Sequence, residues 1–255
     1  SDFDSEIPKY AVEYIELQSL PGPMRLSFQG NTETPLLPVD PGTNGCWWSN
    51  SGDSINSTLT RALDLRELSS ATLKYELWYS LEELWDYAYL EVSTDGGQTW
   101  SILDAPHTSE ENPVGNSYGK GYTGESGGWI QESVNLDAYA GQEVLLRFQY
   151  ITDDAVNGAG LCLRHIAISG GPLTDGWEAN GFILINNHVP QDYIVQVVEM
   201  ARSNQVRVMP LDAANSGEIV VDAPQDLDRL IVAVAALAPK TLQPAAYTIT
   251  IAPVE

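Results

Sequence analysis

Hydrophobic and polar positions alternate along short segments of this chain, and Tyr87–Ser93 shows the pattern most clearly. Its even-numbered positions are Ala, Leu and Val, and its odd-numbered positions begin with Tyr, Tyr and Glu. A period of two residues predicts a β-strand with one face in a core and the other in water. Clusters of Gly, Pro, Asn, Asp and Ser separate further candidate strands. Before residue 170 these are Ala11–Leu17, Met24–Gln29, Gly45–Ser49, Thr58–Asp64, Ala71–Ser80, Trp100–Leu103, Ile130–Asn135, Val144–Ile151 and Gly160–Ser169.

The pattern continues after residue 176, where Leu230–Ala236 is apolar throughout and is expected to be a buried central strand. The other strands expected there are Gly181–Asn186, Tyr193–Met200, Gln205–Leu211, Gly217–Val221 and Ala246–Ile251. No segment carries a long apolar stripe of helical period, and Asp137–Gly141 is expected to form one helical turn. The sequence therefore predicts an all-β protein with the strand spacing of β-sandwiches.

The stretch Ser169–Gly176 is the best candidate for a domain boundary, because it is short, polar and rich in glycine. A chain of 255 residues is long for one sandwich and suits two domains. We therefore expect a first domain over residues 1–171 and a second, smaller β-sandwich over residues 172–255.

The chain is strongly acidic, with 35 acidic and 12 basic residues and a formal net charge of −23. This charge disfavours nucleic acids and anionic membranes as partners. Two interpretations remain: a solvated surface, or the binding of a cation such as Ca²⁺, which prefers carboxylate oxygens. There is no apolar run of about 18 residues, so we expect no membrane insertion.

The two cysteines, Cys46 and Cys162, are too far apart in sequence for a zinc or redox motif. They are either two buried thiols or one disulfide. We favour the disulfide, since the cysteines fall near the first and last strands of the proposed first domain. Such a bond would close a long loop and stabilise the fold by about 4–5 kcal/mol on the chain-entropy model.

The segment Ser93–Trp100 has the form S-x-D-x-G-x-T-W and is similar to the Asp-box hairpins of secreted glycan-handling proteins. Asp95 is expected to accept backbone N–H groups of the turn, with the glycines supplying positive φ and Trp100 capping the core. A structural role is therefore expected. Gly124–Gly128 matches G-x-S-x-G, but it lies in a glycine-rich loop that leads into a strand, which favours a loop over a nucleophile.

Several segments together resemble the region downstream of the catalytic domain in immune-inhibitor-A-type secreted metallopeptidases. They are Trp47–Asp53, Thr58–Arg61, Asp86–Trp100, Gly115–Gly119, Leu136–Gln142 and Leu146–Phe148. The resemblance covers roughly residues 8–170 and implies a MAM-like jelly roll, often with a bound cation. Residues 176–255 more loosely resemble small immunoglobulin-like or prepeptidase-C-terminal-like sandwiches.

The catalytic chemistry of that family does not carry over to this chain. Its zinc site requires H-E-x-x-H, and His107, His165 and His188 are neither followed by Glu nor paired. We therefore expect no enzyme activity and a secreted or cell-surface accessory module that binds a protein or a surface. Its partner would be a protein or a glycan.

Candidate cation ligands are Asp53, Asp153 and Asp154, in loops that flank early and late strands of the expected jelly roll. The resembled family ends its jelly roll with two aspartates before an isoleucine, one of which looks like a cation ligand. Here those positions hold Arg164 and His165. A guanidinium should weaken a Ca²⁺ site, and Arg164 is expected instead to bridge carboxylates such as these three aspartates.

A carbohydrate site is the alternative function. Tyr87, Tyr89 and Glu91 should share one strand face, and Arg147 and Gln149 alternate with apolar residues on Val144–Ile151. If the two strands lie in one sheet, these five side chains converge on its outer face, where aromatic rings could stack on sugars.

Overall fold

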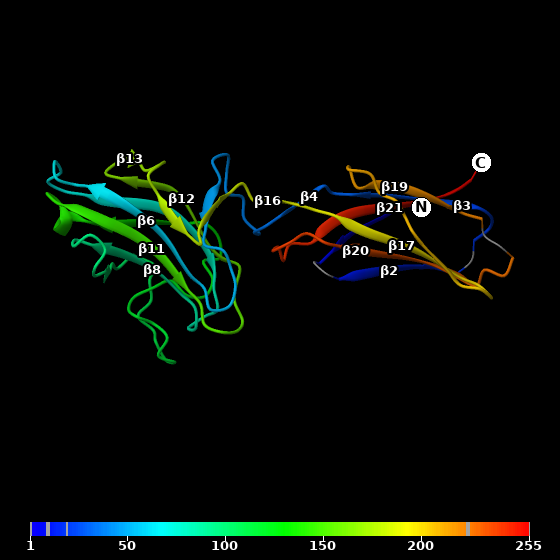
Figure 1. Cartoon of the computed structure of the whole chain (residues 1–255), viewed down its shortest axis with the longest axis horizontal. Coiled ribbons are helices and arrows are strands. Elements are labelled where there is room, and N and C mark those ends of the chain that lie inside the picture. The colour runs from blue at the N-terminus through cyan, green and yellow to red at the C-terminus, as the bar shows by residue number, and fades with distance from the viewer. Residues whose placement is uncertain (1, 9–10, 19, 223–224, 255) are drawn as a thin grey trace. The chain divides into compact units, whose positions relative to one another are not determined.

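A computed structural model describes residues 2–8, 11–18, 20–222 and 225–254. The chain separates into two compact units, one formed by Val39–Asn186 and the other by the residues before and after it, up to Pro38 and from Asn187 (Figure 1). The described residues contain no α-helix, and the expected helical turn is a 3₁₀ turn, η1 (Asp137–Tyr139). The all-β prediction is confirmed. Among the described residues, no helix combines the length and the apolar character needed to cross a membrane.

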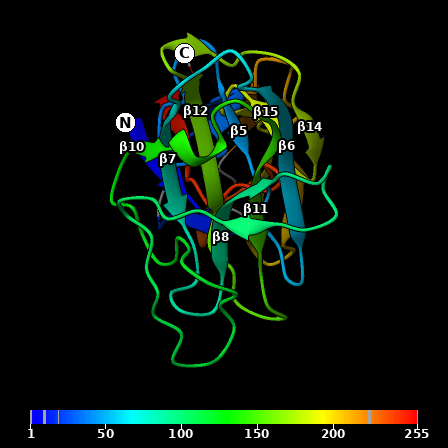
Figure 2. The same cartoon turned by 90° about the vertical axis from the view of Figure 1, so that its left-hand side faces the viewer.

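The unit Val39–Asn186 is a jelly-roll sandwich of two antiparallel sheets, seen as two layers in Figure 2. The first sheet has the order β10 (Ile130–Asn135), β7 (Thr72–Ser80), β12 (Gly160–Ile168), β5 (Cys46–Trp48), β15 (Ile183–Ile185), and β13 (Gly171–Pro172) also pairs with β12. The second has the order β14 (Glu178–Asn180), β6 (Asn56–Asp64), β11 (Glu143–Ile151), β8 (Tyr87–Ser93), β9 (Ser101–Ile102).

The jelly-roll core lies between these sheets and follows the two-residue period. On β11, alternate residues from Val144 to Tyr150 are buried and belong to the core cluster. Ala88, Leu90 and Val92 of β8 join the same cluster. Each fully buried Leu or Val stabilises the sandwich by about 1.5–3 kcal/mol relative to exposure, so this alternation fixes the register of the strands.

The disulfide between Cys46 and Cys162 is confirmed. The bond joins β5 to β12, whose Trp48 and Cys162 are register partners, across a sequence separation of 116 residues. Both cysteines are fully buried. A loop of this length gives about 4–5 kcal/mol of stabilisation on the chain-entropy model.

The second unit is also a sandwich, with two four-stranded antiparallel sheets. One has the order β1 (Asp2–Ile7), β21 (Ala245–Pro253), β3 (Met24–Gly30), β19 (Ser216–Val221). The other has the order β18 (Gln205–Val208), β17 (Tyr193–Met200), β20 (Arg229–Ala236), β2 (Val12–Leu17). A short ladder pairs β4 (Glu33–Pro35) with β16 (His188–Pro190).

The expected division at residues 171 and 172 needs correction, because the second sandwich is built from both ends of the chain. The first strands of the chain pair with the last ones: β2 lies beside β20, and β3 lies between β21 and β19. Ser169–Gly176 instead contains β13 and the turn that joins it to β12, with Gly170 at φ 86° in this turn. The chain then continues to β14 and β15, which remain part of the jelly roll.

This strand pairing predicts which fragments can fold. A fragment of residues 39–186 should melt cooperatively and show a β-sheet circular dichroism spectrum, because it keeps both jelly-roll sheets. A fragment of residues 172–255 should stay unfolded, because it lacks β1, β2 and β3 and thus three of the four strands that flank β20 and β21. Joining residues 1–38 to residues 187–255 through a flexible linker should restore folding. A cooperative transition in the 172–255 fragment alone would contradict the observed pairing.

Candidate functional site

The face of β8 that carries Tyr87, Tyr89 and Glu91 is buried. The prediction that this face is exposed to solvent was therefore wrong. These side chains are 1%, 1% and 6% exposed. The connection between β9 and β10, drawn in green in Figure 2, contacts Tyr87 and Tyr89. Tyr87 donates its hydroxyl to the carbonyl of Glu111 at 2.9 Å, and Tyr118 donates its backbone N–H to the Tyr89 hydroxyl at 3.0 Å.

Arg147 and Gln149 lie on the same sheet face as Tyr89 and Glu91, as the alternation along Val144–Ile151 predicted. In the register of β11 and β8, Arg147 faces Glu91 and Gln149 faces Tyr89. Their polar groups bond within the protein: Arg147 Nε donates to Glu91 Oε2 at 2.6 Å, and Gln149 Nε2 donates to Asn56 Oδ1 at 2.9 Å. The five predicted ligand-binding residues therefore share one face, where the polar ones hold the sheet together.

The turn after β8 has the expected structural chemistry. Asp95 Oδ1 accepts the backbone N–H groups of Gln98 and Thr99, both at 2.9 Å, and Asp95 Oδ2 accepts the Thr99 hydroxyl at 2.6 Å. These hydrogen bonds hold the pKa of Asp95 well below its usual range. Trp100 does not cap the core as expected: it stacks on Arg147, whose guanidinium carbon lies 3.9 Å from the ring centroid, and so braces the outer sheet face.

An open pocket of about 270 Å³ lies at the start of β8. Tyr87 and Tyr89 line it together with Trp85, Tyr118 and the carboxylate-bearing Asp153. Trp85 is 44% exposed and Tyr118 is 76% exposed, so these two rings are the accessible aromatic groups of the pocket. The sequence pattern could not indicate Tyr118, because it lies in an irregular loop that has no periodicity.

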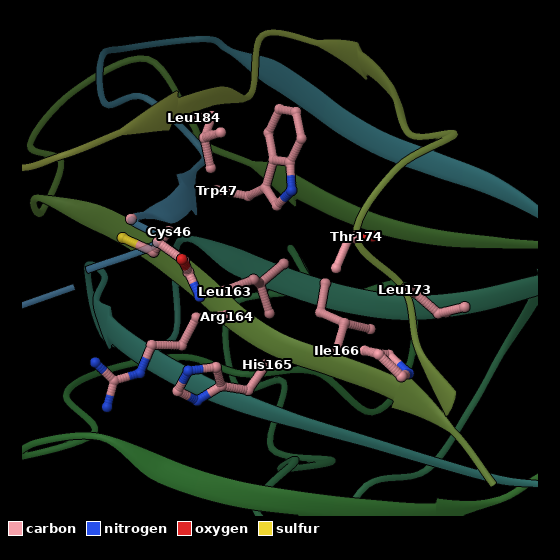
Figure 3. Close-up of a pocket in the computed structure, with 12 residues that line it drawn as sticks. Cys46, Trp47, Leu163, Arg164, His165, Ile166, Leu173, Thr174 and Leu184 are labelled. Atoms are coloured by element: carbon pink, nitrogen blue, oxygen red, sulfur yellow. The ribbon is translucent and has the colours of Figure 1, made fainter. Parts of the chain in front are cut away.

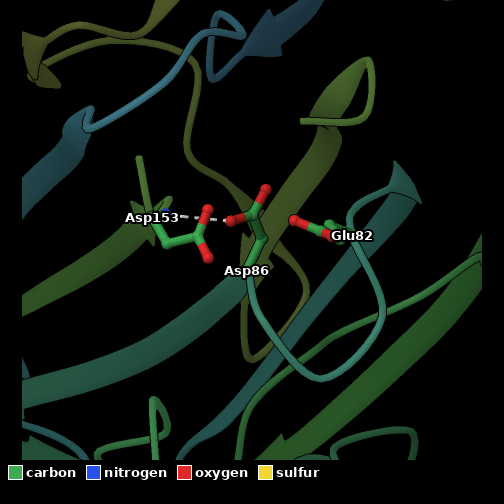
Figure 4. Close-up of side chains that lie close together, drawn as sticks. All are labelled: Glu82, Asp86 and Asp153. Atoms are coloured by element: carbon green, nitrogen blue, oxygen red, sulfur yellow. Dashed lines mark hydrogen bonds between the residues drawn. The ribbon is translucent and has the colours of Figure 1, made fainter. Parts of the chain in front are cut away.

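A group of three carboxylates lies beside this pocket. One oxygen each of Glu82, Asp86 and Asp153 lie within 4.8 Å of one another, the one such group of acidic, His or Cys side chains in the described parts of the chain. Figure 4 shows the carboxylates of Glu82 and Asp153 on opposite sides of that of Asp86. Asp86 is fully buried and accepts the backbone N–H of Asp153 at 3.1 Å, while Glu82 Oε2 is buried without a hydrogen-bond partner.

Burial and repulsion by neighbouring carboxylates disfavour the charged forms of Asp86 and Glu82. Burial raises the pKa of Asp86 from 3.8 to about 6; the backbone N–H of Asp153 opposes this rise, and the charges of Asp153 and Glu82 add to it. Burial and the neighbouring charge of Asp153 also raise the pKa of Glu82. A divalent cation at this position would neutralise the repulsion, and the three residues supply the oxygen ligands that Ca²⁺ prefers.

Of the three predicted cation ligands, only Asp153 belongs to this group. Asp53 accepts the side-chain amide of Asn157 at 2.5 Å, and Asp154 is an exposed loop residue. The two remaining carboxylates come from the turn before β8, where Asp86 N–H donates to the Glu82 carbonyl at 3.0 Å. Neither residue was among the predicted cation ligands; their spacing of four positions in an acidic turn is the signal that could indicate them.

Arg164 pairs with a carboxylate, although not with one of the three aspartates proposed for it. Its Nε lies 2.8 Å from Glu76 Oε2, and its guanidinium carbon lies 3.9 Å from the centroid of the Trp129 ring. Nδ1 of His165 lies 3.3 Å from the other oxygen of Glu76. Arg164 and His165, which stand where the resembled family has aspartates, therefore form a cluster with Glu76 on the first sheet.

A second pocket, of about 420 Å³, adjoins Arg164 and His165. Figure 3 shows Trp47 and Leu184 across this pocket from the two basic residues. The pocket lies where β12 passes from pairing with β5 to pairing with β13, after an irregularity between residues 164 and 167. Its walls are mainly apolar side chains of the jelly roll.

Ser126 and the three histidines contact other groups of the protein. The hydroxyl of Ser126, the serine of G-x-S-x-G, donates to the carbonyl of Tyr79 at 3.1 Å and accepts its N–H at 2.9 Å. The three histidines each face a different carboxylate and do not converge: the pairs are His107 with Glu132, His165 with Glu76 and His188 with Glu33.

Comparisons with known proteins agree with this fold. The family described as "Immune inhibitor A-like, MAM domain" matches residues 25–179. Pre-pro-metalloprotease PrtV of Vibrio cholerae is 31% identical over 115 residues, 45% of this chain and 12% of that protein. Immune inhibitor A of Bacillus thuringiensis is 29% identical over 127 residues, 49% of this chain and 17% of that protein. Bacillopeptidase F of Bacillus subtilis is 26% identical over 100 residues, 39% of this chain and 6% of that protein.

The chain therefore matches less than a fifth of the length of each of these relatives. The match to the MAM-domain family spans more than half of the 255 residues. This chain belongs to the immune inhibitor A-like MAM domain family.

Proposed function

We propose that this chain is a non-catalytic accessory module of a metallopeptidase-like protein and that it binds a protein or surface outside the cell. The family match carries the proposal, because it places the chain with a MAM domain of peptidases. The sequence contains no H-E-x-x-H motif to hold a catalytic zinc. The buried disulfide supports an oxidising, extracellular setting.

We further propose that Ca²⁺ binds Glu82, Asp86 and Asp153 and stabilises the jelly roll. The three carboxylates supply hard oxygen ligands, and the unpaired buried oxygen of Glu82 is a ready ligand atom. An apo form would retain their repulsion. The role is structural, since the ion would join the turn before β8 to the end of β11.

Carbohydrate binding is the second candidate function. The observation that favours it is the pocket at the start of β8, where aromatic rings of Trp85 and Tyr118 are accessible and Tyr87 and Tyr89 form the wall. Aromatic faces of this kind can stack on sugar rings. The predicted face of Glu91, Arg147 and Gln149 supports it less, because those groups bond to protein.

The accessory role predicts that the purified chain has no peptidase activity. Incubation with casein in the presence of Zn²⁺ and Ca²⁺ should leave the substrate intact on a gel, because no histidine pair is available for zinc. Cleavage that copurifies with the chain and disappears in chelator would overturn the proposal.

Calcium should raise the melting temperature of the chain. At a concentration of 100 times its Kd, binding to the native state adds about 2.7 kcal/mol. For a unit of this size we expect a rise of about 5–10 °C over the value in chelator. Differential scanning calorimetry with EDTA and with CaCl₂ measures the effect.

Matched variants locate the calcium effect. Asp86→Asn and Glu82→Gln should abolish the Ca²⁺-dependent rise. Asp53→Asn and Asp154→Asn remove one nearby charge each and should retain it. An equal rise in all four variants would exclude this site.

The pH dependence of stability should reveal the buried carboxyl in the absence of Ca²⁺. The pKa of Asp86 is raised from 3.8 to about 6, so its contribution to stability is fully present below pH 3.8 and is lost as pH rises through 6. In EDTA, the melting temperature of Asp86→Asn relative to the wild type should therefore increase between pH 4 and pH 7.5. A difference between the two proteins that is constant over this range would contradict the raised pKa.

A further inference from the structure

We propose that the pocket at the start of β8, between Trp85 and Tyr118, binds a lysine or arginine side chain of a partner protein. The inference rests on the proposed binding function and names the chemistry of the partner. Its basis is an aromatic pocket that combines π faces with a carboxylate in a strongly acidic protein.

The rings of the pocket are held in a fixed arrangement. Tyr87 and Tyr89 stack with an interplanar angle of 11° and a centroid distance of 6.1 Å. Tyr118 is tilted by 60° against Tyr89, at 6.2 Å. The hydrogen bond from Tyr118 N–H to the Tyr89 hydroxyl fixes the loop that carries the outer ring. The pocket is therefore already formed before a ligand binds.

Trp85 also lines the pocket, and its backbone is held on both sides by hydrogen bonds. Its backbone N–H donates to the carbonyl of Glu82 at 3.3 Å, and its own carbonyl accepts the side-chain amide of Asn116 at 3.4 Å. Since Trp85 and Tyr118 are both exposed, a side chain from another protein can reach between them. The volume of about 270 Å³ suits one long side chain.

The charge of the site selects a cation. Asp153 lines the pocket, and no Lys, Arg or His does so in the described part of the chain. Glu82 and Asp86 lie next to Asp153. A cation gains both from the negative faces of the rings and from the carboxylate, whereas a neutral sugar gains only from the rings and hydrogen bonds. The net charge of −23 also attracts a basic partner before contact.

Asp153 belongs to both this pocket and the proposed calcium site. Bound Ca²⁺ would neutralise the carboxylate that the basic side chain uses. The geometry therefore predicts antagonism, with Ca²⁺ weakening the binding of a basic side chain. Because ligand binding is measured in EDTA and calcium binding is measured without the ligand, either proposal can fail while the other holds.

The test uses the full chain and two labelled peptides of equal length. One carries a single arginine between Gly and Ser residues, and the other carries citrulline, which keeps the shape and lacks the charge. NMR titration in EDTA should show that the arginine peptide binds about tenfold more tightly, a value between those of an exposed and of a desolvated cation–π contact. Equal affinity for the two peptides, or no binding of the arginine peptide, would overturn the proposal.

Variants of the aromatic residues distinguish binding in the pocket from non-specific attraction of the peptide to an acidic surface. Trp85→Ala and Tyr118→Ala leave the net charge unchanged and should each weaken arginine binding about tenfold. Tyr14→Ala removes a comparably exposed ring, 69% exposed on β2, and should have no effect. Melting curves show whether each variant is folded. Unchanged arginine binding in both pocket variants would overturn the proposal, as would a panel of neutral sugars that binds this pocket more tightly than the arginine peptide.

Discussion

The backbone pairing of Ala88 with Tyr122 holds the connection between β9 and β10 across β8. Each residue donates its N–H to the carbonyl of the other, at 2.9 and 2.8 Å. Buried polar groups must find hydrogen-bond partners, and this loop supplies a carbonyl to the buried hydroxyl of Tyr87 and an amide to that of Tyr89. The course of one loop thus decides which side chains of β8 are exposed and where a pocket opens.

The same loop supports the turn that carries Glu82. The Thr123 hydroxyl oxygen accepts the N–H of Leu84 at 2.7 Å and donates to the carbonyl of Glu82 at 3.3 Å. The acidic group and the aromatic pocket therefore share one support, and Asp153 takes part in both. At such short range in a partly buried site, a charge bound at one position changes the electrostatic potential at the other.

Local pattern predicted the strands well because alternation and turn residues act over a few positions. Tyr87–Ser93 and Ile130–Asn135 have the expected bounds. The domain division depended on pairings such as β2 with β20, which join residues more than two hundred positions apart and leave no local signal. The burial of Tyr87 and Tyr89 likewise depended on an irregular loop. Of the acidic group, the sequence indicated Asp153 directly, but only the fold brings Glu82 and Asp86 beside it.

Two acidic places in the jelly roll balance their charge in different ways. At Glu76, the protein supplies its own cation, because Arg164 bonds to one oxygen and stacks on Trp129. At Asp86, the ion pairs formed by the described residues include no partner for the three neighbouring carboxylates. A buried carboxylate without a counter-charge must either take up a proton or attract a cation from outside. The first place is therefore complete in itself, whereas the second is where an external cation would have the greatest effect on this fold.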